Sequence, residues 1–303
     1  MKKILSKILI LLFFLAVNVC LFAGELTVTF LDVGQGDSIL IQTPNGKTML
    51  IDAGGIPTWK QKEMNYVRDP GEYVVVPYLK ANGINKLDCV VGTHADGDHI
   101  GGLPAVLREI PAGIVYENGF ESESPEYQKL HEVMRMKRIV SSTLRQGMHI
   151  NIDPSVTFDV LSPPKDFYFE DSNNNAIVIR MVYGSVSFLF TADMEFEGEY
   201  SVLRKYGEQI QSTILKVGHH GSSTSTSDEF LATVSPEIAI IQVGKYNGFG
   251  HPYTGTLAKF NDAGIEVFRT DKVGNIQINT DGNTFGIKTE RPQVKEPVNK
   301  KGR

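Results

Sequence analysis

The chain has 303 residues, which is enough for one large domain or two small ones, and 41% of them are hydrophobic. That share supports a buried core and excludes extensive disorder. The 30 basic and 35 acidic residues give a formal charge of −5 at pH 7, which excludes a surface that is basic overall and binds nucleic acid everywhere. Any polyanion must therefore bind at a local site.

Residues 1–23 have the pattern of a secretory signal peptide. Lysines near the start precede an apolar run, and a small residue, Ala23, stands at the expected cleavage point. We expect a mature chain that begins at Gly24 and is exported to the periplasm, the cell surface or the medium, with transient association with the cell envelope. The apolar run is shorter than the roughly 20 residues that span a bilayer, so a retained anchor is less favoured. Lipidation at Cys20 ranks third, because the preceding Val19 is bulky for that signal.

The first part of the mature chain predicts a β-meander. Residues 25–33 alternate apolar and polar side chains, and residues 37–43 and 47–53 are strand-like runs on either side of a Pro-Asn-Gly turn. Residues 73–84 then have helical spacing, with Gly83 as the C-terminal stop.

An apolar strand of residues 87–93 follows, and residues 103–110 predict a short helix after it. Cys89 lies inside this strand, where the expected role is that of a small buried hydrophobic residue. It is the only cysteine after the predicted leader, so no disulfide can form within the mature chain.

The second half of the chain repeats the alternation of strands and helices. Strands are predicted at residues 176–184, 186–193 and 212–220, and a helix at residues 197–207. This order predicts an α/β fold in which two layers of β-sheet are flanked by helices, with the polar strand ends gathered at one rim. Residues 289–303 have no apolar period and predict a flexible polar tail, so residues 24–288 form the expected domain.

Two histidines and two carboxylates fall within six positions in the segment THADGDHIGG, at the end of a predicted strand. Imidazole nitrogens and carboxylate oxygens are ligands of zinc, manganese and iron. The spacing lets these side chains turn toward one centre; they are His94, Asp96, Asp98 and His99. Later strands end in further candidates, which are Asp193, His219 and His220, and His251 lies in a third motif. The remaining histidines, His131 and His149, stand alone and are predicted to have no catalytic role.

These segments carry a family resemblance. THADGDHIGG is similar to the signature H-x-H-x-D-H of the metallo-β-lactamase-fold superfamily. Four further blocks resemble, in the same order, the hydrolase domain of the ComEC family of competence DNA-uptake proteins. They are FLDVGQGDSILIQTPNGKTMLIDAGG, SNNNAIVIRMVYGSVSFLFTADME, ILKVGHHGS and YNGFGHP with RTDKVGNI. The resemblance covers residues 25–288 and implies a four-layer αββα sandwich, with two mixed β-sheets between helices. The long membrane segments of the channel are not seen here, so we expect a free-standing hydrolase module.

The resemblance implies two divalent metal ions, Zn²⁺ or Mn²⁺, and assigns ligands by position. His94 and Asp96, the latter in place of the usual histidine, would hold the first ion, while Asp98 and His99 would hold the second. Asp193 would bridge them, from a Thr-Ala-Asp segment where Thr-Gly-Asp is usual. The last ligand comes from the Gly-His-His-Gly segment. We favour His219 and leave open that His220 completes the second site or contacts the substrate.

Further residues are expected around the metals or the substrate. In the superfamily the aspartate that matches Asp52 hydrogen-bonds near the ligands. Asp32 and Gln35 lie, with Asp37, in a glycine-rich turn close to the site. Asn173 and Asn174 stand where most relatives have a third histidine ligand, so one ion would be held more weakly. Lys216 and Asn247 complete this set.

Basic residues beside the motifs offer local positive charge. Lys216, Lys245 and Lys272 could steer a phosphate backbone, although each alone is more typical of an ordinary surface lysine. The single tryptophan, Trp59, lies in a polar stretch with Lys60, Lys62 and Arg68. That stretch is either a solvated loop, the commoner case, or a flap that offers a stacking ring and cations to a nucleic acid.

The favoured function is that of an exported metal-dependent nuclease or phosphodiesterase that acts on DNA, in DNA uptake or in the degradation of extracellular DNA. Two adjacent cations suit an anionic phosphodiester better than a β-lactam. Asp98 would orient the attacking water, and His220 or His251 would protonate the leaving oxygen. The alternatives are an envelope phosphoesterase acting on phosphorylcholine or teichoic acid, a β-lactamase, and a non-catalytic surface module that binds DNA. No organic cofactor is expected, and the oligomeric state is open.

Overall fold

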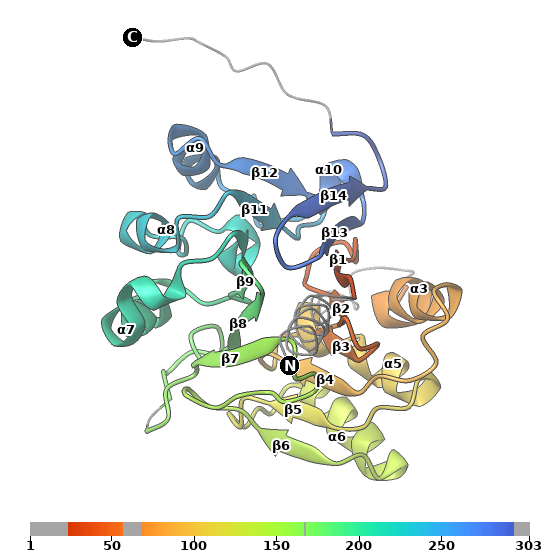
Figure 1. The fold of residues 1–303 in the computed structure, drawn as a ribbon. Helices are drawn as coiled ribbons and strands as arrows, with labels where there is room; N and C mark the ends of the chain where they lie inside the picture. The colour runs from red at the N-terminus through yellow and green to blue at the C-terminus, as the bar shows by residue number, and fades with distance from the viewer. Residues whose placement is uncertain (1–23, 57–67, 167, 294–303) are drawn as a thin grey trace, which may run out of the picture.

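Two β-sheets face each other and carry helices on their outer sides (Figure 1). The structure is a computed structural model that describes residues 24–56, 68–166 and 168–293. The predicted signal peptide lies outside the described residues, and so do Trp59, Lys60 and Lys62 of the predicted flap. None of the helices in the described ranges combines the length and apolar character needed to cross a bilayer.

The first sheet has eight strands in the order β14-β13-β1-β2-β3-β4-β5-β6. Their bounds are β1 Leu26–Phe30, β2 Ile39–Gln42, β3 Thr48–Ile51, β4 Cys89–Gly92, β5 Val115–Glu117, β6 Ser141–Thr143, β13 Ile276–Thr280 and β14 Phe285–Thr289. The first three strands pair antiparallel, which confirms the predicted meander. From β3 to β6 the pairing is parallel.

The second sheet has six strands in the order β12-β11-β10-β9-β8-β7. Their bounds are β7 Thr157–Ser162, β8 Val178–Tyr183, β9 Val186–Phe190, β10 Ile214–Lys216, β11 Ile238–Ile241 and β12 Glu266–Arg269. Strands β7 to β9 pair antiparallel, whereas β9 to β12 pair parallel. Both sheets are therefore mixed, and each contains a parallel part whose strands all end at one edge.

Helices cover both outer faces. Over the first sheet lie the π-helical turn η1 Gly71–Val75, α3 Val76–Ala81, α5 Leu103–Glu109 and α6 Pro125–Lys137. Over the second sheet lie α7 Phe196–Tyr206, the turn η2 Gly207–Ile210, α8 Asp228–Val234 and α9 Thr254–Asp262. Three short elements are α4 Gly97–Ile100, η3 Gly218–Gly221 and α10 Thr270–Val273. The helix predicted at residues 73–84 is thus split into η1 and α3, and Gly83 with φ +70° follows its end as expected.

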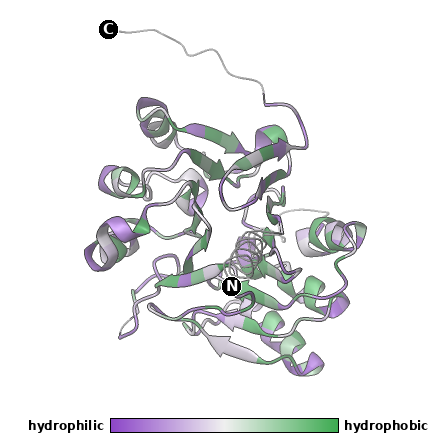
Figure 2. Cartoon of the chain, in the orientation of Figure 1, coloured by the Kyte–Doolittle hydropathy of each residue, from purple (hydrophilic) through white to green (hydrophobic). Residues whose placement is uncertain are grey.

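Three apolar layers hold this arrangement together. Between the sheets, Phe30 and Phe188 are fully buried, and Phe30 lies 6.2 Å from Phe190 between ring centroids. One outer layer joins the first sheet to α3, α5 and α6, and the other joins the second sheet to α7, α8 and α9. Figure 2 shows the same order, with hydrophobic strands inside and hydrophilic colour on the helices. The predicted αββα sandwich is confirmed.

The C-terminal boundary lies later than the sequence indicates. β14 extends to Thr289, and beyond it the Arg291 amide donates a hydrogen bond to the Val273 carbonyl at 2.8 Å. The Gln293 side chain donates to the Val267 carbonyl at 3.1 Å. The first residues of the predicted tail, 289–293, therefore pack on the domain, and residues 294–303 lie outside the described part.

Cys89 is fully buried in β4, as expected, and burial raises the pKa of its thiol to about 12.

Candidate metal centre

The site is assembled from the carboxyl ends of parallel strands in both sheets. In the first sheet, β3 leads into Asp52 and β4 into the segment of residues 93–99. In the second sheet, β9 leads into Asp193 and β10 into the His219–His220 pair. Because the carboxyl ends of parallel strands meet at one edge of a sheet, side chains far apart in the sequence converge there.

The loop after β4 turns tightly into α4. The amides of His99 and Ile100 both donate to the Asp96 carbonyl, at 3.1 and 3.0 Å. The glycine-rich turn before β2 packs on this loop, since the Asp37 amide donates to the Asp98 carbonyl at 3.2 Å. Gly36, with φ +126°, touches the same carbonyl so closely that an added Cβ would lie 2.0 Å from its oxygen. Only glycine fits there, and it fixes the place of Asp98.

Four side chains from the two sheets meet in a buried cluster. His99 Nε2 lies 3.2 Å from Asp193 Oδ1, and His220 Nε2 lies 3.3 Å from Asp193 Oδ2. His220 Nε2 also lies 3.5 Å from Asp98 Oδ2. The His94 ring stacks at a tilt on His99, with 4.2 Å between centroids. His94, His99, Asp193 and His220 are each at most 3% exposed.

The unpaired atoms of this cluster fit a metal site. The Nε2 atoms of His94, His99 and His220 and the Oδ1 atom of Asp193 are buried and form no hydrogen bond. A buried polar group without a partner costs roughly 1–3 kcal/mol, so four such atoms facing one another need a ligand. Among the described residues, three groups have donor atoms close enough to share an ion: His94 with His99 and Asp193, Asp98 with His99 and His220, and Asp37 with Asp52 and His99. In the third group, Asp52 already pairs with His99 and Asp37 with Lys216, which leaves the first two overlapping groups as metal sites. Imidazole and carboxylate are the donors that zinc and manganese take.

Asp52 holds the histidine ligands in orientation. Its Oδ2 accepts hydrogen bonds from His99 Nδ1 at 2.8 Å and from the Thr93 hydroxyl at 2.6 Å, while its Oδ1 accepts from the Thr93 amide at 2.8 Å. Thr93 Oγ1 also lies 3.0 Å from His94 Nδ1. With Nδ1 occupied in this way, the Nε2 atom of His99 is left facing the cluster. The sequence predicts that Asp52 forms hydrogen bonds beside the metal ligands, and the hydrogen bond from His99 agrees with this.

A lysine and an aspartate form a buried ion pair under the cluster. Lys216 Nζ pairs with Asp37 Oδ2, donates to the Ala192 carbonyl at 2.8 Å and lies 3.9 Å from Asp193 Oδ1. Lys216 is 1% exposed, so the prediction that it steers a phosphate backbone from the surface is wrong. Asp37 Oδ1 in turn lies 3.4 Å from His220 Nδ1. The ion pair therefore places the Asp37 carboxylate beside His220 and the Lys216 ammonium beside Asp193.

Lys216→Met is expected to destabilise the metal-free protein by about 3–5 kcal/mol, because it leaves Asp37 buried without its partner. Urea denaturation in the presence of a chelator measures this. The matched control is Lys80→Met, which removes an ion pair with Glu109 whose two side chains are each more than half exposed, and it should leave the denaturation midpoint nearly unchanged. Equal losses in the two variants would contradict the structural role of Lys216.

The electrostatics of the metal-free cluster are strongly coupled. Burial alone would raise the pKa of Asp193, but His220 and His99 lower it well below its usual value. Burial alone would lower the pKa values of His99 and His220, but Asp193 and the neighbouring carboxylates raise both well above the ordinary histidine value. Without a metal, the imidazoles of His99 and His220 thus hold protons that neutralise the carboxylates, whereas burial and the neighbouring His99 lower the pKa of His94. A bound cation would take over that role, since ligands must be deprotonated.

The two neighbouring histidines of η3 have different surroundings. His219 and His220 both have left-handed backbone angles, with φ +45° and +53°, which turn their side chains apart. His220 is buried, and its Nδ1 lies 2.9 Å from the Gln242 carbonyl oxygen, so its Nε2 faces Asp98 and Asp193. His219 is 24% exposed, its Nδ1 lies 2.9 Å from Glu195 Oε1, and its Nε2 is 3.7 Å from Asp193. This geometry favours His220 over His219 as the ligand, against the preference drawn from the sequence.

Two predicted ligand positions lie at the margin. Asp96 is 44% exposed at its side chain, and its Oδ2 lies 3.8 Å from His94 Nε2. Asn174 is buried but occupied, since its side-chain oxygen accepts hydrogen bonds from the amides of Glu195 and Gly198 at the start of α7. Asn173 makes a long contact of 3.5 Å to Glu195 Oε1. The two asparagines therefore build the loop and the start of the helix.

The remaining predicted residues surround the cluster. Gln35 Oε1 accepts a hydrogen bond from the Gly244 amide at 3.2 Å. Asn247 donates to the carbonyls of Gly244 and His251 and accepts from the His251 amide, so it holds the turn between them. Asp32 is half-buried and lies 3.5 Å from Arg291. These residues shape the rim.

His251 lies beside His219, with 5.4 Å between ring centroids. Burial, with added repulsion from His219 and His220, lowers the pKa of His251 to about 4. The ring is therefore neutral near pH 7, which suits it to accept a proton better than to donate one. His131 and His149 pair instead with Glu117 and Asp159, away from the cluster.

Sequence reasoning gave Asp37 only a minor role and missed Glu195 altogether. Glu195 Oε1 contacts His219 and accepts a hydrogen bond from the Thr224 hydroxyl at 2.7 Å. Its place directly after Thr-Ala-Asp-Met was the available signal. The partner of Asp37 lies 179 positions away at Lys216, and no local pattern links them.

The sequence model of the Metallo-beta-lactamase superfamily matches residues 31–245, a range that includes every residue of the buried cluster. The chain belongs to the metallo-β-lactamase superfamily. This fold binds divalent metal ions, often two, which agrees with the two overlapping donor groups.

Curated proteins of the ComEC family are similar to most of this chain. The chain is 35% identical over 288 residues to "ComE operon protein 3" of Bacillus subtilis, covering 91% of this chain and 36% of that protein. It is 33% identical to "Competence protein ComA" of Neisseria gonorrhoeae, covering 89% of this chain and 34% of that protein. The chain thus spans about a third of the length of these relatives. The resemblance to the ComEC family is confirmed.

Two solved structures share this fold at low sequence identity. The metallo-beta-lactamase fold protein YhfI from Bacillus subtilis superposes with a TM-score of 0.51 at 12% identity, over 83% of this chain and 99% of that one. A CmlA beta-hydroxylase mutant gives 0.53 at 13% identity, over 84% of this chain and 54% of that one. At these identities the likeness supports the fold alone.

Proposed function

We propose that this chain is a metal-dependent phosphodiesterase that cleaves DNA. The observation that carries the proposal is the set of buried, unpaired donor atoms shared by His94, His99, Asp193 and His220. The names of the curated relatives, two of which refer to competence, support DNA as the substrate.

The donor set suits two ions. His94, Asp96 and Asp193 would hold one, and Asp98, His99 and His220 would hold the other with Asp193 between them. Two bound divalent cations neutralise charge on a phosphoryl group and lower the pKa of a water molecule, so that hydrolysis proceeds near neutral pH.

Residues of the chain would bind the ions, orient the attacking water and position one another. Asp98 has 19% of its side chain exposed and lines the pocket beside the cluster, so it could both bind a metal ion and orient the attacking water. His219 and His251 lie side by side next to the cluster, and Glu195 contacts His219 Nδ1 and orients its ring. Lys216 stays below the cluster and positions Asp37 and Asp193.

A cleavage assay tests the proposal. Residues 24–303, loaded with Mn²⁺ or Zn²⁺, should cleave single-stranded or duplex DNA, and a chelator should stop the reaction. A phosphorylcholine ester and a β-lactam serve as comparison substrates. Hydrolysis of the phosphorylcholine ester with DNA left intact would favour the envelope phosphoesterase. Metal-loaded protein that binds DNA and hydrolyses nothing would favour the surface binding module.

Manganese is expected to compete with zinc better here than in a histidine-rich site. Asp96 replaces a histidine and the asparagines at 173–175 supply no imidazole, so the donor set is rich in hard oxygen atoms. Apo-protein should regain activity with Mn²⁺ as well as Zn²⁺. Elemental analysis of protein purified without chelator, together with titration of each ion into apo-protein, measures the preference. Reactivation by Zn²⁺ alone would refute it.

We also propose that the chain is exported and that the mature form begins at Gly24. The basic start, apolar run and small residue at position 23 support this. N-terminal sequencing of the native protein from the cell envelope or medium should read from Gly24. An intact Met1 chain recovered from the cytoplasm would contradict the proposal.

A further inference from the structure

A pocket of about 650 Å³ opens beside the metal centre, with Asp98 in its lining. We propose that this pocket binds an unpaired base of single-stranded DNA next to the phosphate that is cleaved. The inference rests on the proposed DNA-cleaving function and adds which form of DNA the site selects.

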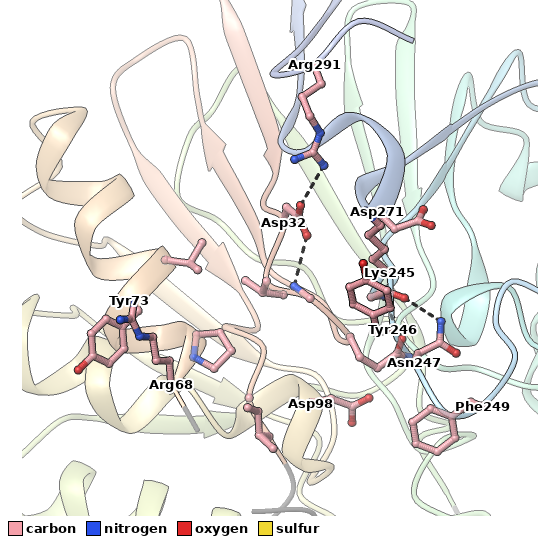
Figure 3. Close-up of a pocket in the computed structure, with 18 residues that line it drawn as sticks. Asp32, Arg68, Tyr73, Asp98, Lys245, Tyr246, Asn247, Phe249, Asp271 and Arg291 are labelled. Atoms are coloured by element: carbon pink, nitrogen blue, oxygen red, sulfur yellow. Dashed lines mark hydrogen bonds and ion pairs between the residues drawn. The ribbon is translucent and has the colours of Figure 1, made fainter. Parts of the chain in front are cut away.

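Aromatic rings stand exposed on both sides of the pocket. Tyr73 is 49% exposed, Tyr246 88% and Phe249 53%. Figure 3 shows Tyr73 on one side, Tyr246 and Phe249 on the other, and Asp98 between them. One exposed ring is ordinary on a protein surface, but three around one hollow next to a reactive site indicate a ligand with flat faces.

A line of rings joins the pocket to the metal centre. Phe249 stacks on His251 with 5.8 Å between centroids and planes 14° apart, and His251 meets the edge of His219 at 5.4 Å. The turn that carries Tyr246 is held in place, because Asn247 bonds to Gly244 and His251. The backbone turn and the Phe249 ring are therefore held in place before any ligand binds, which reduces the entropy lost on binding.

The charges of the pocket favour a base with its phosphates. Arg68, Lys245 and Arg291 line it; Arg68 lies over the Tyr73 ring and Lys245 Nζ over the Tyr246 ring, at 5.2 and 5.4 Å from the centroids. The lining also holds three carboxylates. Asp271 is bonded in two places to Arg269 outside the pocket, Asp32 lies 3.5 Å from Arg291, and Asp98 faces His220 of the buried cluster.

These cations distinguish two ligands that both use aromatic walls. A quaternary ammonium such as choline also binds over aromatic rings, but Arg68 and Lys245 already lie over Tyr73 and Tyr246 and would repel a second cation there. A base stacks on the rings without charge, and its flanking phosphates meet the cations. A duplex keeps its bases stacked on one another, so only an unpaired base offers its face to Tyr246 or Phe249.

Binding can be measured without metal or cleavage. Fluorescence anisotropy with residues 24–303 in chelator would compare three oligonucleotides of equal length: single-stranded oligo-dT, an oligonucleotide with abasic sites, and a duplex. Oligo-dT should bind roughly fivefold to 100-fold more tightly than the other two, which corresponds to about 1–3 kcal/mol per stacked base. Choline at millimolar concentration should not displace it.

Variants assign the effect to the rings. Tyr246→Ala and Phe249→Ala should each reduce the preference for oligo-dT over the abasic oligonucleotide, and Tyr246→Phe should keep it. The matched control is Tyr200→Ala on α7, a tyrosine that is 64% exposed and lies outside the pocket lining, and it should change nothing.

The outcomes separate this inference from the proposed function. If the metal-loaded protein cleaves DNA but binds the abasic oligonucleotide as tightly as oligo-dT, the base pocket is wrong while the function stands. If DNA is not cleaved but the ring-dependent preference is present, the function fails and the pocket stands. Displacement of oligo-dT by choline, or an unchanged preference in the double variant Tyr246→Ala with Phe249→Ala, would overturn the inference.

Discussion

Asp98→Ala is expected to lower kcat for DNA cleavage by on the order of 100-fold or more, with a small change in KM. The side chain lies 3.5 Å from His220 Nε2 and faces the pocket, so its loss removes both a ligand and the group that orients the attacking water. Burial alone would raise the pKa of Asp98, but His220 and His99 hold it below the usual range, which keeps the carboxylate charged at neutral pH.

Two further variants sharpen this test. Asp98→Asn keeps the shape of the side chain without its charge and should lose a similar amount of activity. His149→Ala, at an exposed histidine paired with Asp159, should leave the rate unchanged. Full activity of Asp98→Ala on any substrate that the wild type hydrolyses would remove Asp98 from the site.

His220→Ala is expected to lose one metal ion per chain, whereas His219→Ala keeps both. His220 Nε2 is buried, unpaired and close to two carboxylates, while His219 is partly exposed and bound to Glu195. Elemental analysis after dialysis against metal-free buffer gives the metal content of each variant. His219→Ala should instead lower kcat, since its ring stands at the rim beside His251.

The reverse result is equally clear. If His219→Ala loses a metal ion and His220→Ala retains two, the preference drawn from the sequence is right and the geometry of the metal-free site is not that of the loaded one. The circular dichroism spectra of both variants serve as the check that each is folded.

Periodicity was sufficient for the layers of the fold. The strands around the Pro-Asn-Gly turn, the apolar run of β4 and the helices after each half all have local patterns that fix their type. The sequence did not predict the split between η1 and α3. A π-helical turn depends on tertiary packing, here of Pro70 and Gly71 against the glycines after α4. Gly71 is so close to Gly102 that a Cβ there would lie 2.1 Å from its carbonyl oxygen.

The sequence predicted those site residues that stand out within a single motif. His94, Asp98, His99 and Asp193 follow strand ends and stand out by residue type. Which of His219 and His220 faces the cluster depends on two residues with left-handed backbone angles, and the local sequence does not predict those angles. Lys216 looked like a surface lysine, because nothing local shows that β10 is covered on both faces. The pocket beside Asp98 is lined by seven separate stretches of the chain, so no single motif could predict it.

The donors proposed for the metal centre come from both sheets, and this has a mechanical consequence. His94, Asp96, Asp98 and His99 follow β4 in the first sheet, and Asp193 and His220 follow β9 and β10 in the second. Ions bound there would cross-link the two halves of the chain. A disulfide cannot do this after residue 23, because only one cysteine remains. By mass action, free metal at 100 times its Kd would add about 2.7 kcal/mol to the free energy of unfolding. Scarcity of metal in the surroundings would then expose the protein to proteolysis as well as stop its chemistry, so that its lifetime and its activity would follow the same supply.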